Sequence, residues 1–457
     1  MRRNLILLML FIPILLLNSI TLEESIELAK KNNKELLAEK SDLQSADWAV
    51  KNAFTNFLPK ASFNSTMVRI DDETFDDANE IAMIPTVDIT GTPTGNYLPL
   101  SAGTMSGGFY KTSFQNSFVI QQPVFNGGKV ILGYQMAELA KQQAELAFDN
   151  KSKDISYSVA STYLGILKLQ DMKTLAEKSL NSTLSHLEMA LKKYDVGTAK
   201  KSDVLQWQVK MKNDETSIIE LENGISEMFS FWQNLLGVSE SQKPQKIDVK
   251  DYEAEIITYA NYNQTELTRA ADEFLQEVNS SSPTLLSLEL MNKMMKKNLL
   301  MAKGEFLPDF NMQFSYQIEN DDKFNFDGEN NWNLAAVLSW PIFTSGTNYT
   351  NLVKTKYDVK KAKYETEAMQ ENYLVAARNV FNRLVTRARV VEDNKIALEF
   401  ARENHTIMGD LFKQGLVTNS ELLDAETMLF GTEMQLVSAY YDFILIKQEM
   451  QKYTGRM

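Results

Sequence analysis

"FLPKASFNS" runs from Phe57 to Ser65, and "FLPDFNMQFS" runs from Phe306 to Ser315. In both places the proline follows a stretch of helix formers and precedes a stretch in which apolar and polar residues alternate. Because a proline disfavours the helical conformation in the residue before it, each stretch predicts a corner where a helix stops and a strand begins. The chain contains this FLP corner twice, which makes an internal repeat the first hypothesis about its fold.

Two further pairs of sequence landmarks support the repeat. They are "QQPVFNGGK" (121–129) with "SWPIFTSGT" (339–347), and "YDVGTAKKSDVLQ" (194–206) with "FKQGLVTNSELLD" (412–424). Both pairs align with one shift of 218 residues, the separation of Pro123 from Pro341. A constant shift over about 80 residues indicates two related halves. The FLP corners lie 249 residues apart, so the first half carries about 31 additional residues, which we expect to form a loop within residues 70–112.

Alternating apolar and polar residues predict two strands in each half. The alternation is clear at 310–319 and 332–340 and weaker at 114–121 and 61–70. Each stretch has about ten residues, which is the length of a tilted strand in a membrane barrel. The alternative is a soluble sandwich strand with one solvated face. Four strands are too few to close a barrel, so a barrel would have to be shared by several chains.

The rest of each half predicts very long helices. All ten prolines lie at or before Pro341, and none lies between Val124 and Lys243. A helix from Phe125 to Tyr194 would be about 105 Å long and would have to pack lengthwise against neighbours. Seven-residue registers that predict coiled-coil seams are formed by Val159, Ile166, Leu180, Leu187 and Tyr194, and by Ala377, Leu384, Val391, Leu398 and Phe412, with breaks at Lys173 and His405. Each helix is expected to turn at Gly197 or Gly415 and return as a second helix.

The N-terminus and the composition narrow the class of protein. Residues 1–19 combine two arginines with an apolar run, which predicts a signal peptide. The alternative is a membrane anchor, but the apolar run of roughly 13 residues is shorter than the ~20 that a spanning helix needs. The absence of cysteine excludes disulfides and thiolate metal sites. The net charge of −13 argues against nucleic acid as a partner, because phosphate binding needs a basic surface.

The chain resembles the TolC-type outer-membrane efflux protein family. The likeness rests on "ITLEESIELAKKNNKEL" (20–36), the FLP corners, "QPVFNGG" with "WPIFTSG", and the two tip sequences at 194–206 and 412–424, and it covers nearly everything after the signal peptide. It implies a mainly α protein with a β-barrel: a homotrimer with one 12-stranded outer-membrane barrel, four strands per chain, continued by a long periplasmic α-helical barrel of coiled coils. Each chain would supply two helix-strand-strand-helix repeats, 20–238 and 283–457, joined by an equatorial segment at 239–282.

The resemblance also implies a function. The trimer would be the passive exit duct of a tripartite efflux or type I secretion system in the cell outer membrane, with its helical barrel in the periplasm. A periplasmic adaptor and an inner-membrane pump would be its partners. The alternative is a coiled-coil structural or surface tether that conducts nothing. An enzyme is the weakest hypothesis, because the two histidines have no metal-ligand spacing and nucleotide-binding and nucleophile motifs are missing; no catalytic residue, cofactor or metal is expected. The sequence does not predict which substrate is exported.

Two acidic residues are candidates for the channel entrance. Glu421 and Asp424 are three apart on a predicted helix and therefore share a face. The resemblance places them at the periplasmic entrance, where three chains would bring six carboxylates together. Crowded like charges attract cations, so this ring would select or bind cations. The alternative is an ordinary solvated helix face on an acidic protein.

The resemblance implies a gate and a docking site at the tips. The acidic gate residue would be Asp203 and its aromatic partner Phe412, while Val417 stands where the family pattern has an arginine. Phenylalanine and valine lack hydrogen-bond donors, so the closed state would be looser or held by other pairs, such as Lys200 or Lys201 with a carboxylate. Adaptor docking would use Val196, Gly197 and Thr198 at the first tip and Gly415, Leu416 and Val417 at the second; the alternative is that the glycines only turn the chain.

Two smaller expectations concern a histidine and the loops. His405 falls in the heptad register of the second half and is expected to be a packed or lumen-edge residue rather than a ligand. The loops at 71–111 and 320–330 are expected to face outside. Their acidic stretches are consistent with divalent-cation binding or with charged, flexible loops.

Overall fold

A computed structural model describes residues 19–456 except 79, 102–110, 239–241 and 322. The predicted signal peptide, apart from Ser19, lies outside the described residues. The chain divides into two compact units. The helical unit is drawn from the segments up to Ala46, Gln142–Asn292 and from Lys363 onward, and the sheet unit from Asp47–Lys141 and Lys293–Ala362.

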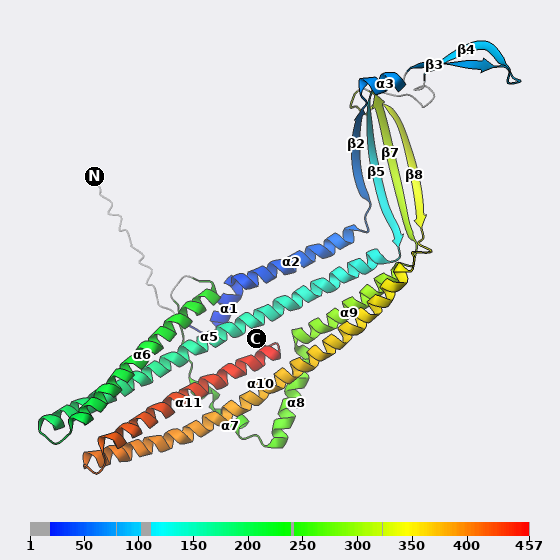
Figure 1. The fold of residues 1–457 in the computed structure, drawn as a ribbon. Coiled ribbons are helices and arrows are strands. Elements are labelled where there is room, and N and C mark those ends of the chain that lie inside the picture. The colour runs from blue at the N-terminus through cyan, green and yellow to red at the C-terminus, as the bar shows by residue number, and fades with distance from the viewer. Residues whose placement is uncertain (1–18, 79, 102–110, 239–241, 322, 457) are drawn as a thin grey trace, which may run out of the picture. The chain divides into compact units, whose positions relative to one another are not determined.

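Two very long helices confirm the prediction made from the proline-free tracts. Helix α5 (Lys129–Asp195) and helix α10 (Thr347–Lys413) have 67 residues each. At 1.5 Å per residue each is about 100 Å long. Each turns and returns as a second helix, α6 (Lys201–Leu236) or α11 (Asn419–Tyr453), so the chain forms two helical hairpins (Figure 1).

Short elements precede and connect the hairpins. The other helices outside the additional segment of the first half are α1 (Leu22–Asn32), α2 (Lys34–Thr55), η1 (Val249–Tyr252), α7 (Glu253–Ala260), α8 (Gln264–Ser281) and α9 (Pro283–Gly304). Strand β1 (Ser19–Ile20) pairs in parallel with β6 (Lys243–Pro244). The predicted equatorial segment therefore contains β6, η1, α7 and α8. None of the helices in the described part of the chain has both the length and the apolar character that crossing a membrane requires.

The core of the helical unit follows the predicted seams. Val159 and Ile166 of α5 and Leu384 and Val391 of α10 have no exposed surface. Leu180 and Phe412 are half-buried, and Tyr194 is exposed, with 44% of its surface accessible. It lies in the last turn of α5, beside the exposed tip, where the seam has ended.

The four predicted strands form one antiparallel sheet. They are β2 (Lys60–Arg69), β5 (Thr112–Asn126), β7 (Asp309–Asp321) and β8 (Glu329–Ser339), in the order β2-β5-β7-β8. Both halves thus contribute two strands to one sheet, which places β2 and β8 at its edges (Figure 1).

The register gives the sheet one apolar and one polar face. Cross-strand rows on the apolar face are Phe63, Phe118, Tyr316 and Trp332, and Ala61, Ile120, Phe314 and Leu334. Trp332 and Leu334 are exposed in the single chain, at 67% and 59%. The other face is polar and carries cross-strand hydrogen bonds between side chains. The Gln121 amide donates to Gln313 at 3.0 Å, and the Gln115 amide donates to Glu319 at 3.3 Å. The alternation read from the sequence therefore separates two chemically different surfaces.

The additional segment of the first half differs from the predicted loop. It contains helix α3 (Asp72–Ala78) and a hairpin of β3 (Ile81–Val87) and β4 (Pro93–Ser101), while residues 79 and 102–110 lie outside the described residues. The Asp88 carboxylate accepts the N–H groups of Thr90 and Thr92 at 2.8 and 2.9 Å. This side-chain capping makes a tight turn between two apolar stretches, and such a turn forms a hairpin.

Candidate functional site

The two tips are built in the same way. At the first, Gly197 has a φ of 76°, and the Thr198 N–H donates to the Lys193 carbonyl at 2.8 Å. At the second, Gly415 has a φ of 73°, and the Leu416 N–H donates to the Leu411 carbonyl at 3.0 Å. A left-handed glycine that ends a helix in this way is favoured because other L-residues are strained there. The tip glycines therefore have a structural role whatever else they do.

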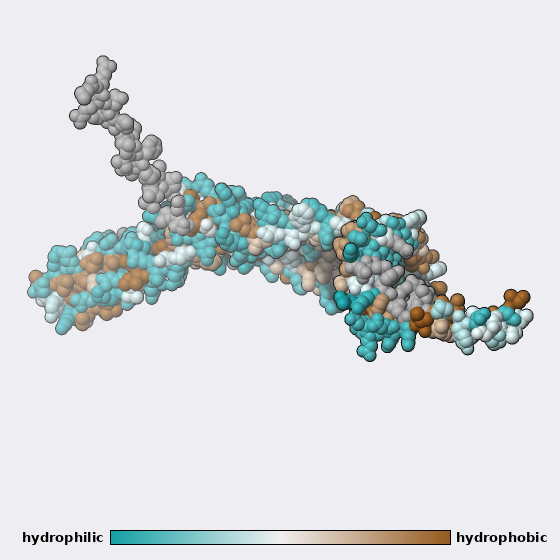
Figure 2. All heavy atoms as spheres, turned by 90° about the horizontal axis from the view of Figure 1, so that it is seen from above, coloured by the Kyte–Doolittle hydropathy of each residue, from teal (hydrophilic) through white to brown (hydrophobic). Residues whose placement is uncertain are grey.

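The residues predicted to dock an adaptor lie at the surface of these tips. Five of the six are exposed, and Val417 is half-buried. Val196 and Leu416 are apolar and leave 74% and 67% of their surface exposed. Figure 2 shows hydrophobic patches in brown where the helical hairpins end at their tips. An exposed aliphatic side chain on each tip is a contact surface that the single chain leaves uncovered.

The acidic residue Glu421 caps the helix that follows the second tip. Thr418 is the N-cap of α11, and its hydroxyl accepts the Glu421 N–H at 3.3 Å. In return, Glu421 Oε2 accepts the Thr418 N–H at 2.7 Å and the Thr418 hydroxyl at 2.8 Å. The hydrogen bond from the Thr418 backbone, and then that from its hydroxyl, lowers the pKa of Glu421. Glu421 is exposed and keeps its negative charge, but its carboxylate is already used in a capping box.

Asp424 and Asp203 have different surroundings. Asp424 is exposed and lines a groove of about 670 Å³ between α6 and α11, together with Lys210 and Asp214. Asp203, the repeat counterpart of Glu421, accepts the Lys200 N–H at 3.1 Å in the first turn of α6. Both repeat-related acids therefore stabilise the start of a helix.

Phe412, the predicted aromatic gate residue, packs between the two tips. Its ring lies 4.3 Å from the Lys193 ammonium of the first tip, and its side chain packs on a cluster that includes buried Trp207 and Leu422. The structure thus gives Phe412 a cation–π partner, while Asp203 bonds to the Lys200 backbone. The polar partner of Asp203 therefore lies on its own tip, and that of Phe412 lies on the other tip.

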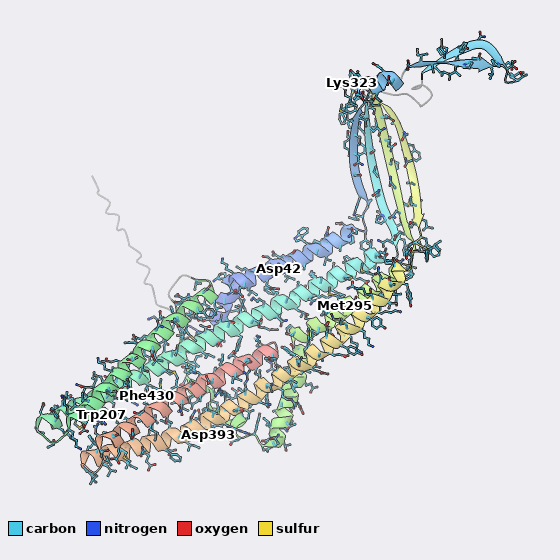
Figure 3. All side chains as sticks on the ribbon, in the orientation of Figure 1. Asp42, Trp207, Met295, Lys323, Asp393 and Phe430 are labelled. Atoms are coloured by element: carbon cyan, nitrogen blue, oxygen red, sulfur yellow. The ribbon has the colours of Figure 1, made fainter. Side chains whose placement is uncertain are left out.

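The sequence reasoning missed the polar contact that joins the two hairpins behind the tips. Trp207 on α6, labelled near the tips in Figure 3, has 1% of its surface exposed. Its indole N–H donates to Asn419 on α11 at 2.5 Å. The Asn419 amide in turn donates to Gln206 at 2.8 Å. No local pattern indicates this contact, because its residues lie more than 200 positions apart. His405, predicted to be a packed or lumen-edge residue, is half-buried and lies beside Glu426.

The comparisons with known proteins agree with this architecture. Residues 25–228 and 274–456 match the family described as "Outer membrane efflux protein". The outer membrane protein TolC of Vibrio cholerae is 22% identical over 330 residues, which cover 70% of this chain and 72% of that protein. The outer membrane efflux protein BepC of Brucella suis is 21% identical, with 80% and 76% covered. The alkaline protease secretion protein AprF of Pseudomonas aeruginosa is 20% identical, with 75% and 70% covered.

Solved structures show the same fold. The transmembrane channel CusC is similar with a TM-score of 0.77 at 14% identity, over 95% of this chain and 92% of that one. The open state of the MtrE outer membrane channel of Neisseria gonorrhoeae is similar with a TM-score of 0.70 at 15% identity, over 95% and 88%. Since the family match covers most of the residues, the chain belongs to the outer membrane efflux protein family, whose members are outer-membrane channels of efflux and secretion systems.

Proposed function

We propose that three copies of this chain form a passive exit duct across the outer membrane and the periplasm, for substrates delivered by an inner-membrane pump through a periplasmic adaptor. The observation that carries this proposal is the four-stranded sheet. One of its faces exposes large apolar side chains, and β2 and β8 are edge strands. Exposed edges and an exposed apolar face are unstable in water. Twelve strands from three chains would pair the edges and turn the apolar faces toward lipid.

Adaptor docking at the tips is supported by their shape and chemistry. The turns at Gly197 and Gly415 leave small or aliphatic side chains at the very end of each hairpin. Another helical hairpin could approach such an end without burying a charge. We assign docking to Val196, Gly197 and Thr198 and to Gly415, Leu416 and Val417, in addition to the role of the glycines in turning the chain.

Glu421 and Asp424 are assigned to a cation-selective ring at the periplasmic entrance. Both are exposed, so neither charge is neutralised by a buried partner. Capping does not remove the charge of Glu421, because the same hydrogen bonds that fix its side chain favour the ionised form. Three copies would place six such carboxylates around one opening.

For the gate, the contacts favour packing over hydrogen bonding between the tips. Phe412 has no hydroxyl and lies against Lys193, so the second tip is held to the first by a cation–π contact. Asp203 would contribute charge near the opening while it holds the first turn of α6. If Asp203→Asn leaves conductance and selectivity unchanged, Asp203 has no part in the gate.

The test is single-channel conductance of the detergent-purified protein in a planar bilayer. We expect discrete cation-selective steps that a multivalent cation blocks from the periplasmic side. The double substitution of Glu421→Gln with Asp424→Asn should reduce selectivity and abolish the block. The matched control is Glu399→Gln with Glu403→Gln, which removes two exposed charges from α10 away from the tip.

The competing function is a structural tether, which has no lumen. A tether predicts no steps in the wild type and none in variants with altered tips. If protein that has assembled and inserted into the bilayer shows no conductance steps, the proposal of a duct is wrong.

A further inference from the structure

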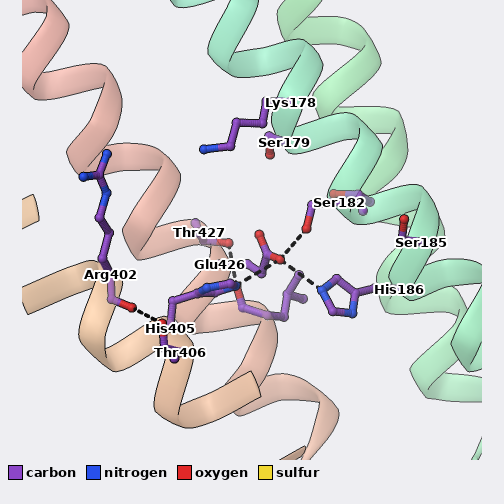
Figure 4. A network of polar contacts seen from close by, with 12 residues as sticks. Lys178, Ser179, Ser182, Ser185, His186, Arg402, His405, Thr406, Glu426 and Thr427 are labelled. Carbon is purple, nitrogen blue, oxygen red and sulfur yellow. Dashed lines mark hydrogen bonds and ion pairs between the residues drawn. The ribbon is translucent and has the colours of Figure 1, made fainter. Parts of the chain in front are cut away.

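Both histidines of the chain converge on one carboxylate. His186 belongs to α5 in the first half, and His405 belongs to α10 in the second. Their Nε2 atoms lie 3.0 and 3.2 Å from the same oxygen, Oε1 of Glu426 on α11 (Figure 4). The Ser182 hydroxyl donates to that oxygen at 2.6 Å. Side chains from three helices therefore meet at a single atom.

Glu426 carries its negative charge in a buried position. Only 8% of its surface is exposed. Burial by itself would raise the pKa of Glu426, but hydrogen bonds from His186 and Ser182, and then the charges of the two imidazoles, lower it to about 2. A buried carboxylate is costly unless positive charge lies next to it. The groups that can supply this charge are the two imidazoles.

The permanent charges around the cluster have other partners. Lys178 of α5 and Arg402 of α10 lie 3.3 and 3.6 Å from Glu433, two turns further along α11. Lys210 and Asp214, on the neighbouring helix α6, form an ion pair with each other. Around this cluster, the halves are thus joined by charged contacts of two kinds. Glu433 is paired with cations that stay charged, and Glu426 with imidazoles whose charge depends on pH.

Each histidine ring has one buried nitrogen that makes no hydrogen bond, Nδ1 in His186 and Nε2 in His405. The His405 nitrogen is close enough to Glu426 for an ion pair but is not aligned as a hydrogen-bond donor. The His186 ring is fixed in place because it stacks on Trp207, with centroids 4.7 Å apart. Within the part of the chain that the structure describes, no three His, Cys, Asp or Glu side chains are arranged to hold a metal ion. Imidazole is the side chain whose unperturbed charge change falls between about pH 5 and 8.

We propose that His186, His405 and Glu426 form a proton-operated latch that joins the first half of the chain to the second. Proton uptake at mildly acidic pH turns the contacts with Glu426 into ion pairs and tightens the latch. Loss of those protons leaves a buried carboxylate with neutral partners and loosens it. The consequence for transport rests on the proposed function: any movement that separates α5 from the hairpin of α10 and α11 must break the latch, so mild acid opposes that movement.

Hydrogen–deuterium exchange tests the latch without requiring conduction. Exchange of the peptides that span residues 419–435 is measured in the assembled protein at about pH 7.5 and about pH 5.5, and each rate is divided by the intrinsic rate at that pH. We expect protection of these peptides to rise about tenfold on acidification, which is the effect of a difference of one pKa unit between the closed and the open latch.

Three variants make the measurement specific. Glu426→Gln keeps the shape of the side chain and should abolish the rise in protection. Glu433→Gln removes the pH-independent contact, so it should lower protection at both pH values and keep the rise. His405→Gln keeps the contact of His186 with Glu426 and should give a smaller rise in protection. It is the test variant to use if Glu426→Gln does not assemble. A wild type without the rise, or a rise that survives both Glu426→Gln and His405→Gln, would overturn the latch.

Conductance of the same samples separates the latch from the duct. If the exchange behaves as expected and acid lowers the open probability in the wild type but not in Glu426→Gln, the latch acts on the channel. If the exchange behaves as expected but no variant conducts, the latch is supported and the proposed duct is overturned.

Discussion

Thr418 and Glu421 hold the first turn of α11 through reciprocal hydrogen bonds, and two substitutions separate capping from charge. Thr418→Ala removes the hydroxyl that accepts the Glu421 N–H at 3.3 Å. Glu421→Gln keeps an oxygen that can accept from Thr418 but removes the negative charge. We expect Thr418→Ala to weaken the start of the helix and preserve ion selectivity. Glu421→Gln should leave the start of the helix nearly as stable as in the wild type and should reduce ion selectivity.

The size of the first effect follows from the capping geometry. Loss of a threonine N-cap costs about 1 kcal/mol, which increases local opening of the first turn about fivefold. The opening should be confined to that turn, because Leu422 and Ala425 are buried behind it, with 1% and 2% of their surfaces exposed. Glutamine can take the place of glutamate in a capping box, so Glu421→Gln should change opening less. It removes one negative charge per chain and therefore three per assembled trimer.

Two assays read the two effects from the same preparations. Hydrogen exchange of residues 418–424 reports opening of the first turn, and the reversal potential in a salt gradient reports selectivity. Glu403→Gln on α10 is the control for a general change in net charge. If Thr418→Ala shifts the reversal potential as far as Glu421→Gln, the position of the carboxylate matters as well as its charge. If Glu421→Gln keeps wild-type selectivity, Glu421 does not belong to the ring.

Three further predictions test the tip, the sheet and the buried acid. Gly415→Ala places a side chain at a φ of 73° and should cost about 1 kcal/mol in urea unfolding, whereas Gly431→Ala inside α11, where an added Cβ meets open space, should be neutral or stabilising. Leu334→Lys on the apolar face of the sheet should cost about 2–4 kcal/mol of membrane insertion and lower the yield of trimer in membranes, while Asn333→Lys on the polar face should be tolerated. The pKa of Glu426 is lowered to about 2 from an ordinary 4.5, so the stabilising effect of its charge is lost as the pH falls from about 4.5 toward 2. The urea midpoint of the wild type should therefore approach that of Glu426→Gln over this range, and a constant difference would contradict the assignment.

The sequence predicted the long helices and the four strands because their signals are local and repeated. Proline-free tracts and period-two alternation each depend on neighbouring residues, and the second half, with its clear pattern at 310–319, identified the weaker strands of the first. The hairpin at β3 and β4 had no counterpart in the second half to support it. Its turn was nevertheless readable, because Asp88, Thr90 and Gly91 lie between two apolar stretches.

At the candidate site, the local roles were readable from the sequence and the long-range ones were not. Thr418 and Glu421 have the spacing of a capping box, so the cap could have been found from the residues alone. The contact of Glu426 with His186 could not, since these positions lie 240 residues apart and do not correspond under the 218-residue shift. Only the packing of α5 against α11 brings them together. His405 lies 21 residues before Glu426, across the turn at Gly415, so the predicted helical hairpin already places these two near each other.

Burial decides which acidic residues can act on a passing ion. Glu426 and Glu433 are buried, and their charges are balanced by histidine, lysine and arginine side chains that hold the helices together. Glu421 and Asp424 lie within two turns of Glu426 on α11 but are exposed, so their charges act on the solution around them. Helix α11 can therefore carry both an ion-attracting surface and one residue of the proton-operated latch. It follows that mild acid should act mainly through the imidazoles, because the lowered pKa of Glu421 keeps its charge in place; a loss of cation selectivity near pH 5.5 that persists in His186→Gln and His405→Gln would contradict this division.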